Sequence, residues 1–343
     1  MLFLESMSEP TPPVAVVIPV YNMARYLAPC LDSALTQTYP NFRIFAVDDG
    51  STDESPAILG EYAARHANLT VIRQSNKGLA GARNTGIRSA LAAPEHFDYV
   101  FFFDSDDLLK ENTLSACVNA ALTHRCDLVT CGVQCFDKNG DTPAPPLPKG
   151  GRITQAEAIR RFFSPQWTDS AVSHFACNNL YARWLLEKIP FDERFRKGED
   201  QPFLVSVLAA LESVALVPEN LYLYRLRGSS ISKSKSKSKL QLDYFLDTLE
   251  APETPDAMKT GLFDRAFNVW WQDLNLAYQT DDKDYVNELE GIFPRLKSHF
   301  ALYPPKNKDR RRLRIHALGR FVLKLYFSLR KNKASSANAA FFD

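Results

Sequence analysis

The sequence has no apolar run that approaches the ~20 residues needed to cross a bilayer. Its first ten residues, MLFLESMSEP, lack the basic segment of a signal peptide, and Glu5 interrupts their short apolar run. The six cysteines include no C-x-x-C pair, so we expect buried free thiols of a reducing cytoplasm rather than zinc ligands or disulfides. These absences leave a soluble globular protein, for which 45% apolar and 24% charged residues are ordinary values.

The net charge of +1 conceals an uneven distribution of charge along the chain. Residues 306–333 contain eleven Lys or Arg and a single acid, Asp309, whereas the remainder carries 30 basic and 39 acidic residues. One short segment is therefore strongly cationic in an otherwise acidic protein. The length of 343 residues exceeds one average domain and predicts a main domain with an appendage.

The first hundred residues alternate between strand and helix patterns. Continuous apolar runs bounded by polar residues predict buried strands, and apolar residues at helical spacing lie between them. The four predicted strands are VAVVIPV (14–20), FRIFAVDD (42–49), LTVIRQ (69–74) and DYVFFFD (98–104). This alternation is the mark of an α/β fold with a parallel, Rossmann-like sheet flanked by helices.

Polar residues follow the end of each predicted strand. They are Tyr21 and Asn22, Asp48 and Asp49, Asn76 and Lys77, and Asp104, Asp106 and Asp107. Right-handed crossovers bring several such ends to one edge of a sheet, which is where ligands of open α/β sheets bind. We therefore expect a single site at this edge.

The segment FFFDSDDLL (101–109) runs from a buried strand directly into three aspartates. Carboxylates packed at a strand end repel one another unless a cation lies among them, which favours a divalent metal that faces phosphate. Aspartate is also a good N-cap residue, so an acidic turn that caps the next helix explains the segment equally well. The segment alone leaves both interpretations open.

The remaining sequence is less regular. DKNGDTPAPPLPKGG (137–151) is rich in Pro and Gly and predicts a surface excursion. Apolar patterns after it predict helices in AEAIRRFF, NNLYARWLLEKI and QPFLVSVLAALE, and a late strand in LYLYR (221–225). The Lys/Ser tract at 232–239 is of low complexity and positively charged, so we expect it to be mobile, with a helical region beyond it.

Five motifs resemble the family-2 glycosyltransferases, a large family of inverting enzymes with a GT-A fold. They are VVIPVYN (16–22), QTYPNFRIFAVDDGSTDES (37–55), NKGLAGARNTGI (76–87), FFFDSDDLL (101–109) and GEDQPF (198–203). Each is weak alone, but together they keep the family's order over residues 14–232 and are highly specific. Within the family the chain looks most like bacterial enzymes that build capsule, lipopolysaccharide or other surface polysaccharides.

The resemblance implies a nucleotide site at the first two strand ends. Pro19, Tyr21 and Asn22 lie where family members place the nucleotide base, and a packed rim residue is the alternative for Tyr21. Asp49 would accept a hydrogen bond from the N3–H of uracil. The alternative for Asp49 is a cap on the helix start at Ser51–Asp53.

The resemblance also implies cations that offset the charge of the diphosphate. Arg83 matches the family's A-R-N, and Lys77 lies in the same glycine-rich stretch, which lets backbone approach a ligand closely. A solvated loop residue is the alternative for Lys77. Arg227 falls where a His or Arg commonly reaches the diphosphate, and Arg225 is the alternative for that role.

By the same resemblance, the acidic segment corresponds to the family's D-x-D motif, with Asp104 and Asp106 as its two acids. Asp106 would be a direct ligand of Mn²⁺ or Mg²⁺, and Asp104 would contact the ribose or a metal-bound water. The ion would bridge the diphosphate and stabilise the departing nucleotide. Asp107 is an extra acid, which a supporting role or a helix cap explains equally well.

GEDQPF supplies the predicted catalytic pair. In the family, the aspartate of E-D takes the proton from the attacking hydroxyl, which makes Asp200 the predicted base. Glu199 would orient the acceptor or a backbone amide. A carboxylate favoured by the dipole of the following helix is the alternative, and a helix start can also present the base.

Two positions depart from the family pattern. Met23 stands where an acidic residue often follows Y-N, and Asn179 stands where relatives frequently have lysine. The second departure bears on contacts near the donor or acceptor sugar, so sugar specificity is not transferred from the family.

Residues 313–331, drawn as a helix, place apolar and basic residues on opposite sides. The apolar stripe contains Ile315, Leu318, Val322, Leu325, Tyr326 and Leu329, and the opposite side contains Arg320, Lys324 and Lys331. This pattern predicts a helix that lies on an anionic membrane surface, where lipid-linked acceptors are found. The alternatives are a helix packed on the catalytic domain and a nucleic-acid patch.

The predicted organisation is an N-terminal extension (1–13), a GT-A catalytic domain (14–232), a Lys/Ser tract with a helical extension (233–305) and a basic C-terminal segment (306–343). The predicted function is metal-dependent, inverting transfer of a sugar from a nucleotide-diphosphate donor. We expect the sugar to be a hexose and the donor to be a UDP-sugar. The acceptor would be a hydroxyl of a glycan or lipid-linked glycan at the inner face of the plasma membrane.

Two other functions remain open. A sugar nucleotidyltransferase would need a glycine-rich, basic loop after the first strand, and VIPVYNMARYL has no glycine there. An inactive nucleotide-sugar-binding scaffold at the membrane would not need the carboxylates of Asp106 and Asp200, which are both present.

Overall fold

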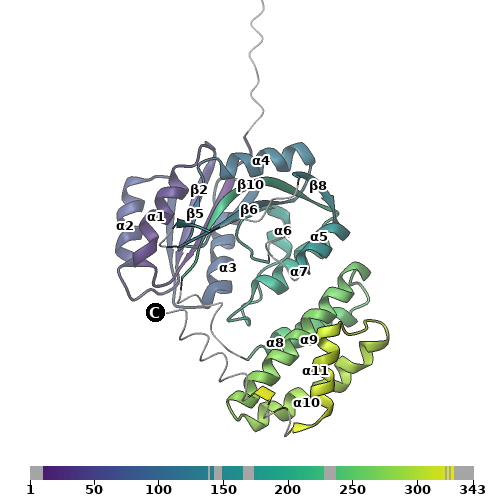
Figure 1. Cartoon of the computed structure of the whole chain (residues 1–343). Coiled ribbons are helices and arrows are strands. Elements are labelled where there is room, and N and C mark those ends of the chain that lie inside the picture. Colours follow the sequence, from purple (N-terminus) through teal and green to yellow (C-terminus); the bar gives the residue numbers. More distant parts are fainter. Residues whose placement is uncertain are drawn as a thin grey trace, which may run out of the picture. The chain divides into compact units, whose positions relative to one another are not determined.

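The computed structural model describes residues 11–137, 140–142, 149–164, 174–227 and 237–320, together with 323, 326 and 327. The chain divides into two compact units, Met1–Ser232 and Lys233–Asp343. The first contains a sheet flanked by helices, and the second is helical (Figure 1). Predictions for residues 1–10, most of the Pro-rich excursion and most of the Lys/Ser tract lie outside the described residues.

Four parallel strands form one half of the sheet in the order β3-β2-β1-β4. They are β1 (Val14–Val20), β2 (Phe42–Asp48), β3 (Leu69–Arg73) and β4 (Tyr99–Phe102), and each confirms a predicted strand. β1 is central: Val14 pairs with Phe42 on one side and with Tyr99 on the other. Every residue of β1 is buried, which is why its sequence is a continuous apolar run.

The other half makes the sheet mixed rather than wholly parallel, continuing as β9-β6-β10-β5. Its strands are β5 (Leu108–Leu109), β6 (Leu128–Asp137), β7 (Gly140–Asp141), β8 (Gly151–Thr154), β9 (Asn179–Ala182) and β10 (Ser213–Arg225). β6 and β10 pair in parallel, whereas β9 runs antiparallel to both β4 and β6. The prediction of a parallel sheet therefore holds for the first four strands and for the pair β6 and β10, whereas β9 runs the other way between them.

β9 also corrects a predicted helix. The pattern in NNLYARWLLEKI predicted one helix, but its second to fifth residues form β9, and α6 (Arg183–Lys188) begins after them. All four strand residues are buried between β4 and β6. A short apolar run does not distinguish a buried strand from a helix by periodicity, and here the pairing with two neighbours decides.

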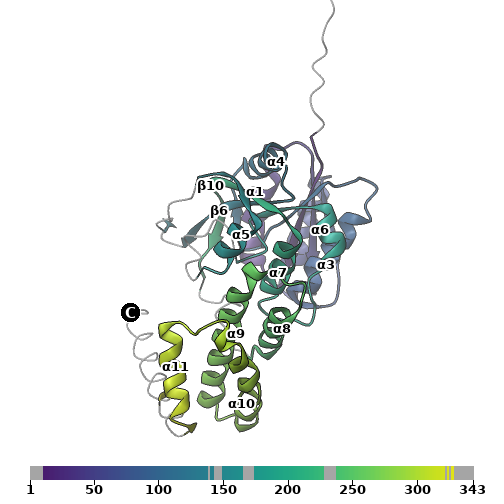
Figure 2. The same cartoon turned by 90° about the vertical axis from the view of Figure 1, so that its right-hand side faces the viewer.

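Helices cover both faces of the sheet (Figures 1 and 2). The helices that share one apolar core on one face are α1 (Ala24–Leu35), α2 (Ser55–Arg65) and α4 (Thr113–His124). The other helices of this unit include α3 (Gly78–Leu91), α5 (Gln155–Phe162) and α7 (Asp200–Ala210). All six cysteines are free thiols and five are buried, as the sequence predicted.

Gly86 allows α3 to lie directly on β1. A Cβ atom at this glycine would stand 2.3 Å from Cγ1 of Val17, so no larger residue fits without movement of the strand. Arg83 lies one turn earlier on α3 and therefore on the same side of the helix. The close approach thus carries Arg83 over the sheet, toward the end of β4.

The second unit confirms the predicted helical extension. Its helices in the described residues are α8 (Lys239–Glu250), α9 (Asp256–Gln279), α10 (Lys283–Ser298) and α11 (Asn307–Ala317), with a 3₁₀ turn, η2, at His299–Ala301. Trp270 of α9 is fully buried and donates its indole N–H to the carbonyl of Leu289 in α10. No helix among the described residues is long and apolar enough to span a membrane.

The predicted helix at 313–331 differs from the structure. α11 ends at Ala317, and Gly319 has a φ of +88°, which interrupts the helix. Leu323 and Phe327 are buried, and Tyr326 and Phe327 pack against Trp271 of α9. Part of the expected apolar stripe therefore packs inside its own unit. Five of the stripe and basic positions named for the predicted helix lie outside the described residues: Val322, Lys324, Leu325, Leu329 and Lys331.

Candidate active site

The loops after β1 and β2 are fastened to each other. Asn22 has a φ of +54°, a conformation that Asn tolerates better than most residues, and its N–H donates to Oγ of Ser51 at 3.1 Å. Its Oδ1 accepts from the N–H of Thr52 at 2.8 Å. Pro19 is buried in β1, whereas the side chain of Tyr21 is exposed. Asn22 therefore shapes the loop, and both Tyr21 and Asn22 are exposed to solvent.

Asp49 binds the loop that starts α3. Its carboxylate accepts from the backbone N–H groups of Lys77 and Gly78 at 2.8 and 2.9 Å and from Nε2 of Gln74 at 2.7 Å. The predicted alternative placed Asp49 as a cap at Ser51–Asp53, but Asp48 makes that contact, because its Oδ1 accepts from the N–H of Ser51. The side chain of Lys77 is exposed.

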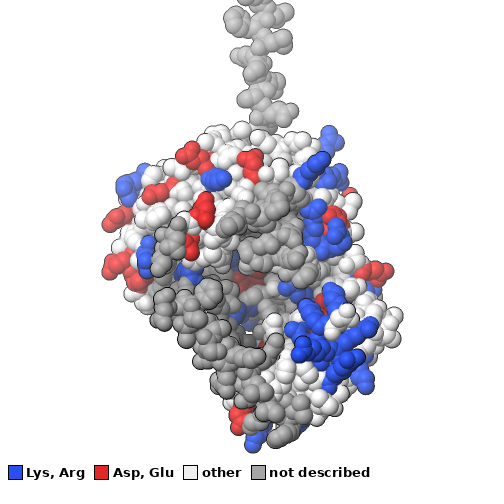
Figure 3. Space-filling model, in the orientation of Figure 1, with Lys and Arg blue, Asp and Glu red and all other residues white. Residues whose placement is uncertain are grey.

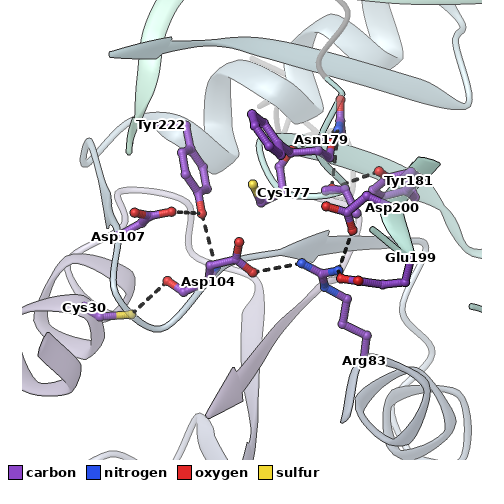
Figure 4. Close-up of polar contacts among 12 residues, drawn as sticks. Cys30, Arg83, Asp104, Asp107, Cys177, Asn179, Tyr181, Glu199, Asp200 and Tyr222 are labelled. Atoms are coloured by element: carbon purple, nitrogen blue, oxygen red, sulfur yellow. Dashed lines mark hydrogen bonds and ion pairs between the residues drawn. The ribbon is translucent and has the colours of Figure 1, made fainter. Parts of the chain in front are cut away.

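Arg83 joins the acidic motif after β4 to the carboxylates at the start of α7 (Figure 4). Its Nη1 donates to Glu199 at 2.8 Å and to Asp200 at 2.5 Å, and its Nη2 donates to Asp104 at 3.0 Å. The Arg83 side chain is 1% exposed. One buried guanidinium therefore binds three carboxylates that come from two distant motifs.

Asp200 is the first residue of α7 and Glu199 is its N-cap, so the predicted helix start is also present. Burial raises the pKa of Asp200 to about 7; Arg83 opposes this shift, and the charges of Glu199 and Asp104 add to it. The backbone of Ala176 also forms a hydrogen bond to Asp200. A carboxylate with a pKa near neutrality is suited to accept and release a proton.

Asp106 forms an ion pair with Arg227, with 2.5 Å between Oδ2 and Nε. Burial raises the pKa of Asp106, as does the charge of Asp104, and Arg227 counteracts both. Nε of Arg225 donates to the backbone carbonyl of Asp106 at 2.7 Å. The two arginines considered for one role thus differ: Arg227 binds the Asp106 carboxylate, and Arg225 binds backbone.

Asp107 anchors the acidic loop to β10. It accepts from the hydroxyl of Tyr222 and from the N–H of Arg225, both at 2.7 Å. The Tyr222 hydroxyl in turn accepts from the N–H of Asp104 at 3.2 Å. Asp107 is 1% exposed, and it fits the predicted supporting role rather than a cap on the next helix, whose N-cap is Asn112.

Tyr222 is a site residue that the sequence analysis missed. It is buried in LYLYR, which was identified only as a strand. Alternation along the strand shows that Tyr222 and Tyr224 share a face, but nothing in the sequence says that this face meets the acidic loop. The pairing of β5 with β10, which places Leu109 opposite Tyr222, brings the two together.

Asn179 has a structural explanation in this chain. Its side-chain amide donates to the carbonyls of Phe175 and Cys177, both at 2.9 Å, and its Oδ1 accepts from the hydroxyl of Thr130 at 2.6 Å. These contacts hold the segment that includes Ala176, which forms the hydrogen bond to Asp200. The side chain is 2% exposed, so it acts on the site through this segment.

The carboxylates suit a metal ion that also binds phosphate. Within the described residues, no three His, Cys, Asp or Glu side chains are grouped so as to hold a metal. Asp104 and Asp106 nevertheless lie in one loop, and the mutual repulsion that raises the pKa of Asp106 would be relieved by a cation. Mg²⁺ is commonly bound by one or two carboxylates plus substrate phosphates, so the pair fits such an ion when a diphosphate is present.

The structure gathers the predicted site residues into a few separate groups at the strand ends. Arg83, Asp104, Glu199 and Asp200 are in direct contact, and Asp106 with Arg227 lies in the same acidic loop. Asp49 and the backbone of Lys77 form a second group at the start of α3. Pro19, Tyr21 and Asn22 form a third at the end of β1.

Comparisons with known proteins agree with these motifs. The model of "Glycosyl transferase family 2" matches residues 15–189. Glycosyltransferase EpsJ of Bacillus subtilis, described as uncharacterized, is 33% identical over 65% of this chain and 63% of its own length. The minor teichoic acid biosynthesis protein GgaB of the same organism is 27% identical over 63% of this chain and 23% of its own length. The chain thus spans less than two thirds of these relatives.

Solved structures share the fold. S. aureus TarS in complex with UDP-GlcNAc superposes with a TM-score of 0.65 at 20% identity, over 83% of this chain and 81% of that one. The mannosyltransferase PcManGT from Pyrobaculum calidifontis, in complex with GDP-Man and Mn²⁺, gives 0.52 at 17% identity, over 93% and 86% of the two chains. These likenesses establish a GT-A-like fold with a helical C-terminal region.

Proposed function

The chain belongs to glycosyl transferase family 2, and we propose that it transfers a sugar from a UDP-sugar to a hydroxyl of a glycan or lipid-linked glycan. The observation that carries this proposal is the position of Asp200, held by Arg83 beside Asp104 of the acidic motif. One carboxylate on the acceptor side and an acidic motif for the leaving diphosphate are the parts that a single displacement needs.

In the proposed reaction, Asp200 takes the proton from the acceptor hydroxyl as that oxygen attacks the anomeric carbon. The bond from this carbon to the diphosphate oxygen breaks, and the configuration inverts. Asp106 and Asp104 would hold Mn²⁺ or Mg²⁺, which supplies positive charge to the diphosphate when bound. Arg227 adds a second cation there, Asp49 and Tyr21 bind the base, and Glu199 orients the acceptor.

The relatives favour an acceptor in surface polysaccharide synthesis. GgaB acts in minor teichoic acid biosynthesis by its description, and a chondroitin synthase of Escherichia coli is 37% identical over 32% of this chain. Capsule, lipopolysaccharide and teichoic acid chains all offer sugar or polyol hydroxyls. We propose an acceptor of this class, without a particular sugar or linkage.

Attachment to an anionic membrane is part of the proposal, and the exposed face of α11 supports it. Lys308, Arg311 and Arg314 follow at three-residue spacing and are exposed, and Leu318, four residues further, is 66% exposed. Figure 3 shows basic side chains gathered in the region of α11. The opposite face packs inward, where Arg312 donates to Asn268 of α9.

Vesicle flotation tests this attachment. Reversal of two charges in Arg311→Glu/Arg314→Glu should lower affinity for vesicles with anionic lipid at least about tenfold, since each basic residue contributes about 1 kcal/mol at such a surface. Lys110→Glu/Lys149→Glu, at exposed positions of the first unit, is the matched control and should change little. Equal losses in both double variants, or none in either, would contradict attachment through α11.

A screen of nucleotide sugars with Mn²⁺ or Mg²⁺ tests the proposed reaction itself. UDP-sugars should show metal-dependent release of UDP, and a glycan acceptor should increase that release. Binding of nucleotide sugars without any release or transfer would point to an inactive binding scaffold. Transfer of a nucleotidyl group to a sugar phosphate would replace the proposal by a nucleotidyltransferase.

A further inference from the structure

Arg83 and Arg227 are both cations of the site, but they have different surroundings. Both η nitrogens of Arg83 donate to carboxylates of the protein, at 2.5 to 3.0 Å. Arg227 pairs with one carboxylate, that of Asp106. Nη1 of Arg227 lies 3.5 Å from the sulfur of Met23. Met23 stands where the family pattern often has an acidic residue.

The η nitrogens of Arg83 are buried and each already donates to a carboxylate of the protein, so a diphosphate would have to displace these contacts to reach them. The guanidinium lies 5.3 Å from the centre of the Phe191 ring, and the side chain is 1% exposed. Three carboxylates around one cation leave an excess of negative charge, which repels a diphosphate. The A-R-N position therefore does not act here as the cation that binds phosphate.

The contacts of Arg83 instead connect the two sides of the proposed reaction. Asp104 belongs to the loop after β4, on the donor side, and Asp200 begins α7, on the acceptor side. The planar guanidinium donates to both at once and fixes the distance between them, which a flexible ammonium group does not do. Gly86 supports this arrangement because it lets α3 lie close to β1.

We propose that Arg83 is a positioning residue, which holds the Asp200 and Asp104 carboxylates at a fixed separation and does not contact the nucleotide. The inference rests on the proposed transfer reaction, in which Asp200 must stand in line behind the anomeric carbon. A misplacement of about 1 Å costs about a hundredfold in rate. The role therefore predicts a loss of turnover without a loss of nucleotide binding.

The test compares Arg83→Lys with Arg227→Lys, which makes the same change at the other arginine. We expect Arg83→Lys to lower kcat about a hundredfold while the donor KM and the calorimetric affinity for UDP with Mg²⁺ stay unchanged. Arg227→Lys should weaken UDP binding about tenfold, because it exchanges a forked donor for a point charge. A loss of UDP affinity in Arg83→Lys as large as in Arg227→Lys, with kcat retained, would overturn the proposal.

A measurement on the unaltered protein covers the case in which Arg83→Lys does not fold. In protein labelled with ¹⁵N-arginine, UDP and Mg²⁺ should shift the guanidinium NMR signals of Arg227 strongly and those of Arg83 much less, because Arg83 meets the bound ligands only through Asp104. A shift of the Arg83 signals comparable to that of Arg227 would contradict the proposal. Neither calorimetry nor NMR requires turnover, so failure to find a transfer reaction would count against the proposed function separately.

Discussion

Two charged clusters lie at the same edge of the sheet and differ in how many protein carboxylates surround their arginine. In the first cluster, Arg83 binds Asp104, Glu199 and Asp200 and is 1% exposed. In the second, Asp106 and Arg227 form one ion pair, and Arg227 is 16% exposed. The first is closed by protein contacts, and the second offers a carboxylate and a cation that a metal and a diphosphate can take over.

This difference separates two tasks of a sugar transfer. A base must be in place before the acceptor arrives, so its carboxylate benefits from fixed partners. Groups that receive a leaving diphosphate must exchange their own contacts for those of the ligand, which is less costly for a single pair than for a buried network. We therefore propose that the first cluster takes the proton and that the second receives the leaving group.

The largest effect that distinguishes the clusters is expected from Asp200→Asn. The amide keeps the shape of the side chain but cannot accept the proton, so kcat should fall by about 10²–10⁴-fold. Calorimetry should show unchanged binding of UDP with Mn²⁺, because we propose that Asp200 acts on the acceptor. Near-normal transfer by this variant would remove Asp200 from its role.

Asp106→Asn should have the opposite pattern. Loss of the carboxylate proposed to bind the metal should lower the Mn²⁺-dependent affinity for UDP at least about tenfold. A titration of UDP at several Mn²⁺ concentrations measures this effect. The clusters would not divide the work as described if Asp106→Asn bound UDP normally and failed only in turnover.

The pH dependence of transfer examines the first cluster alone. Asp200 must be ionised to act as a base, and burial raises its pKa to about 7. Below that value kcat/KM should fall about tenfold per pH unit, and above it kcat/KM should level off. Initial rates at limiting donor concentration give kcat/KM, and its pH dependence reports the pKa of the base in the free enzyme. A rate that stays constant as the pH is lowered from about 8 to about 5 would show that a different group is the base.

Tyr222→Phe should have the smallest effect on the reaction, because Tyr222 holds the acidic loop through Asp107 and the backbone of Asp104. The variant removes the hydroxyl that donates to the buried Asp107, which should cost about 1–3 kcal/mol in the free energy of unfolding. Urea denaturation measures this loss.

Tyr99→Phe is the control in the same unit, since no hydrogen bond of the Tyr99 hydroxyl is found among the described residues. We expect it to change the free energy of unfolding much less than Tyr222→Phe does. Equal stability of both variants would mean that the Asp107 contact does not hold the acidic loop.

The sequence predicted the first half of the fold more completely than the second. The four parallel strands follow from apolar runs that end in polar residues, and all four are present. β9 was mistaken for helix because a four-residue buried strand has no periodicity of its own. Its pairing with β4 and β6 is a tertiary contact, which the local pattern does not contain.

The candidate site shows the same limit. Motif order identified Asp106 and Asp200, but the contact between Arg83 and three carboxylates depends on how α3 and α7 meet over the sheet. The charge of Arg83 suggested that it binds phosphate. Only the folded chain shows that its η nitrogens donate to protein carboxylates instead. Similarly, Tyr326 of the C-terminal stripe packs on Trp271, which amphipathic spacing alone does not distinguish from a surface that meets lipid.

The central claim is that one base in the first cluster and a leaving group at the second produce transfer in a single displacement. ¹H NMR of the glycoside formed from a UDP-α-sugar tests it most directly, because the H1–H2 coupling reports the anomeric configuration of the new linkage, and a glycoside does not mutarotate. The account predicts a β-linked product. An α-linked product would require two displacements or a different geometry, and would contradict the assignment of a single base at Asp200.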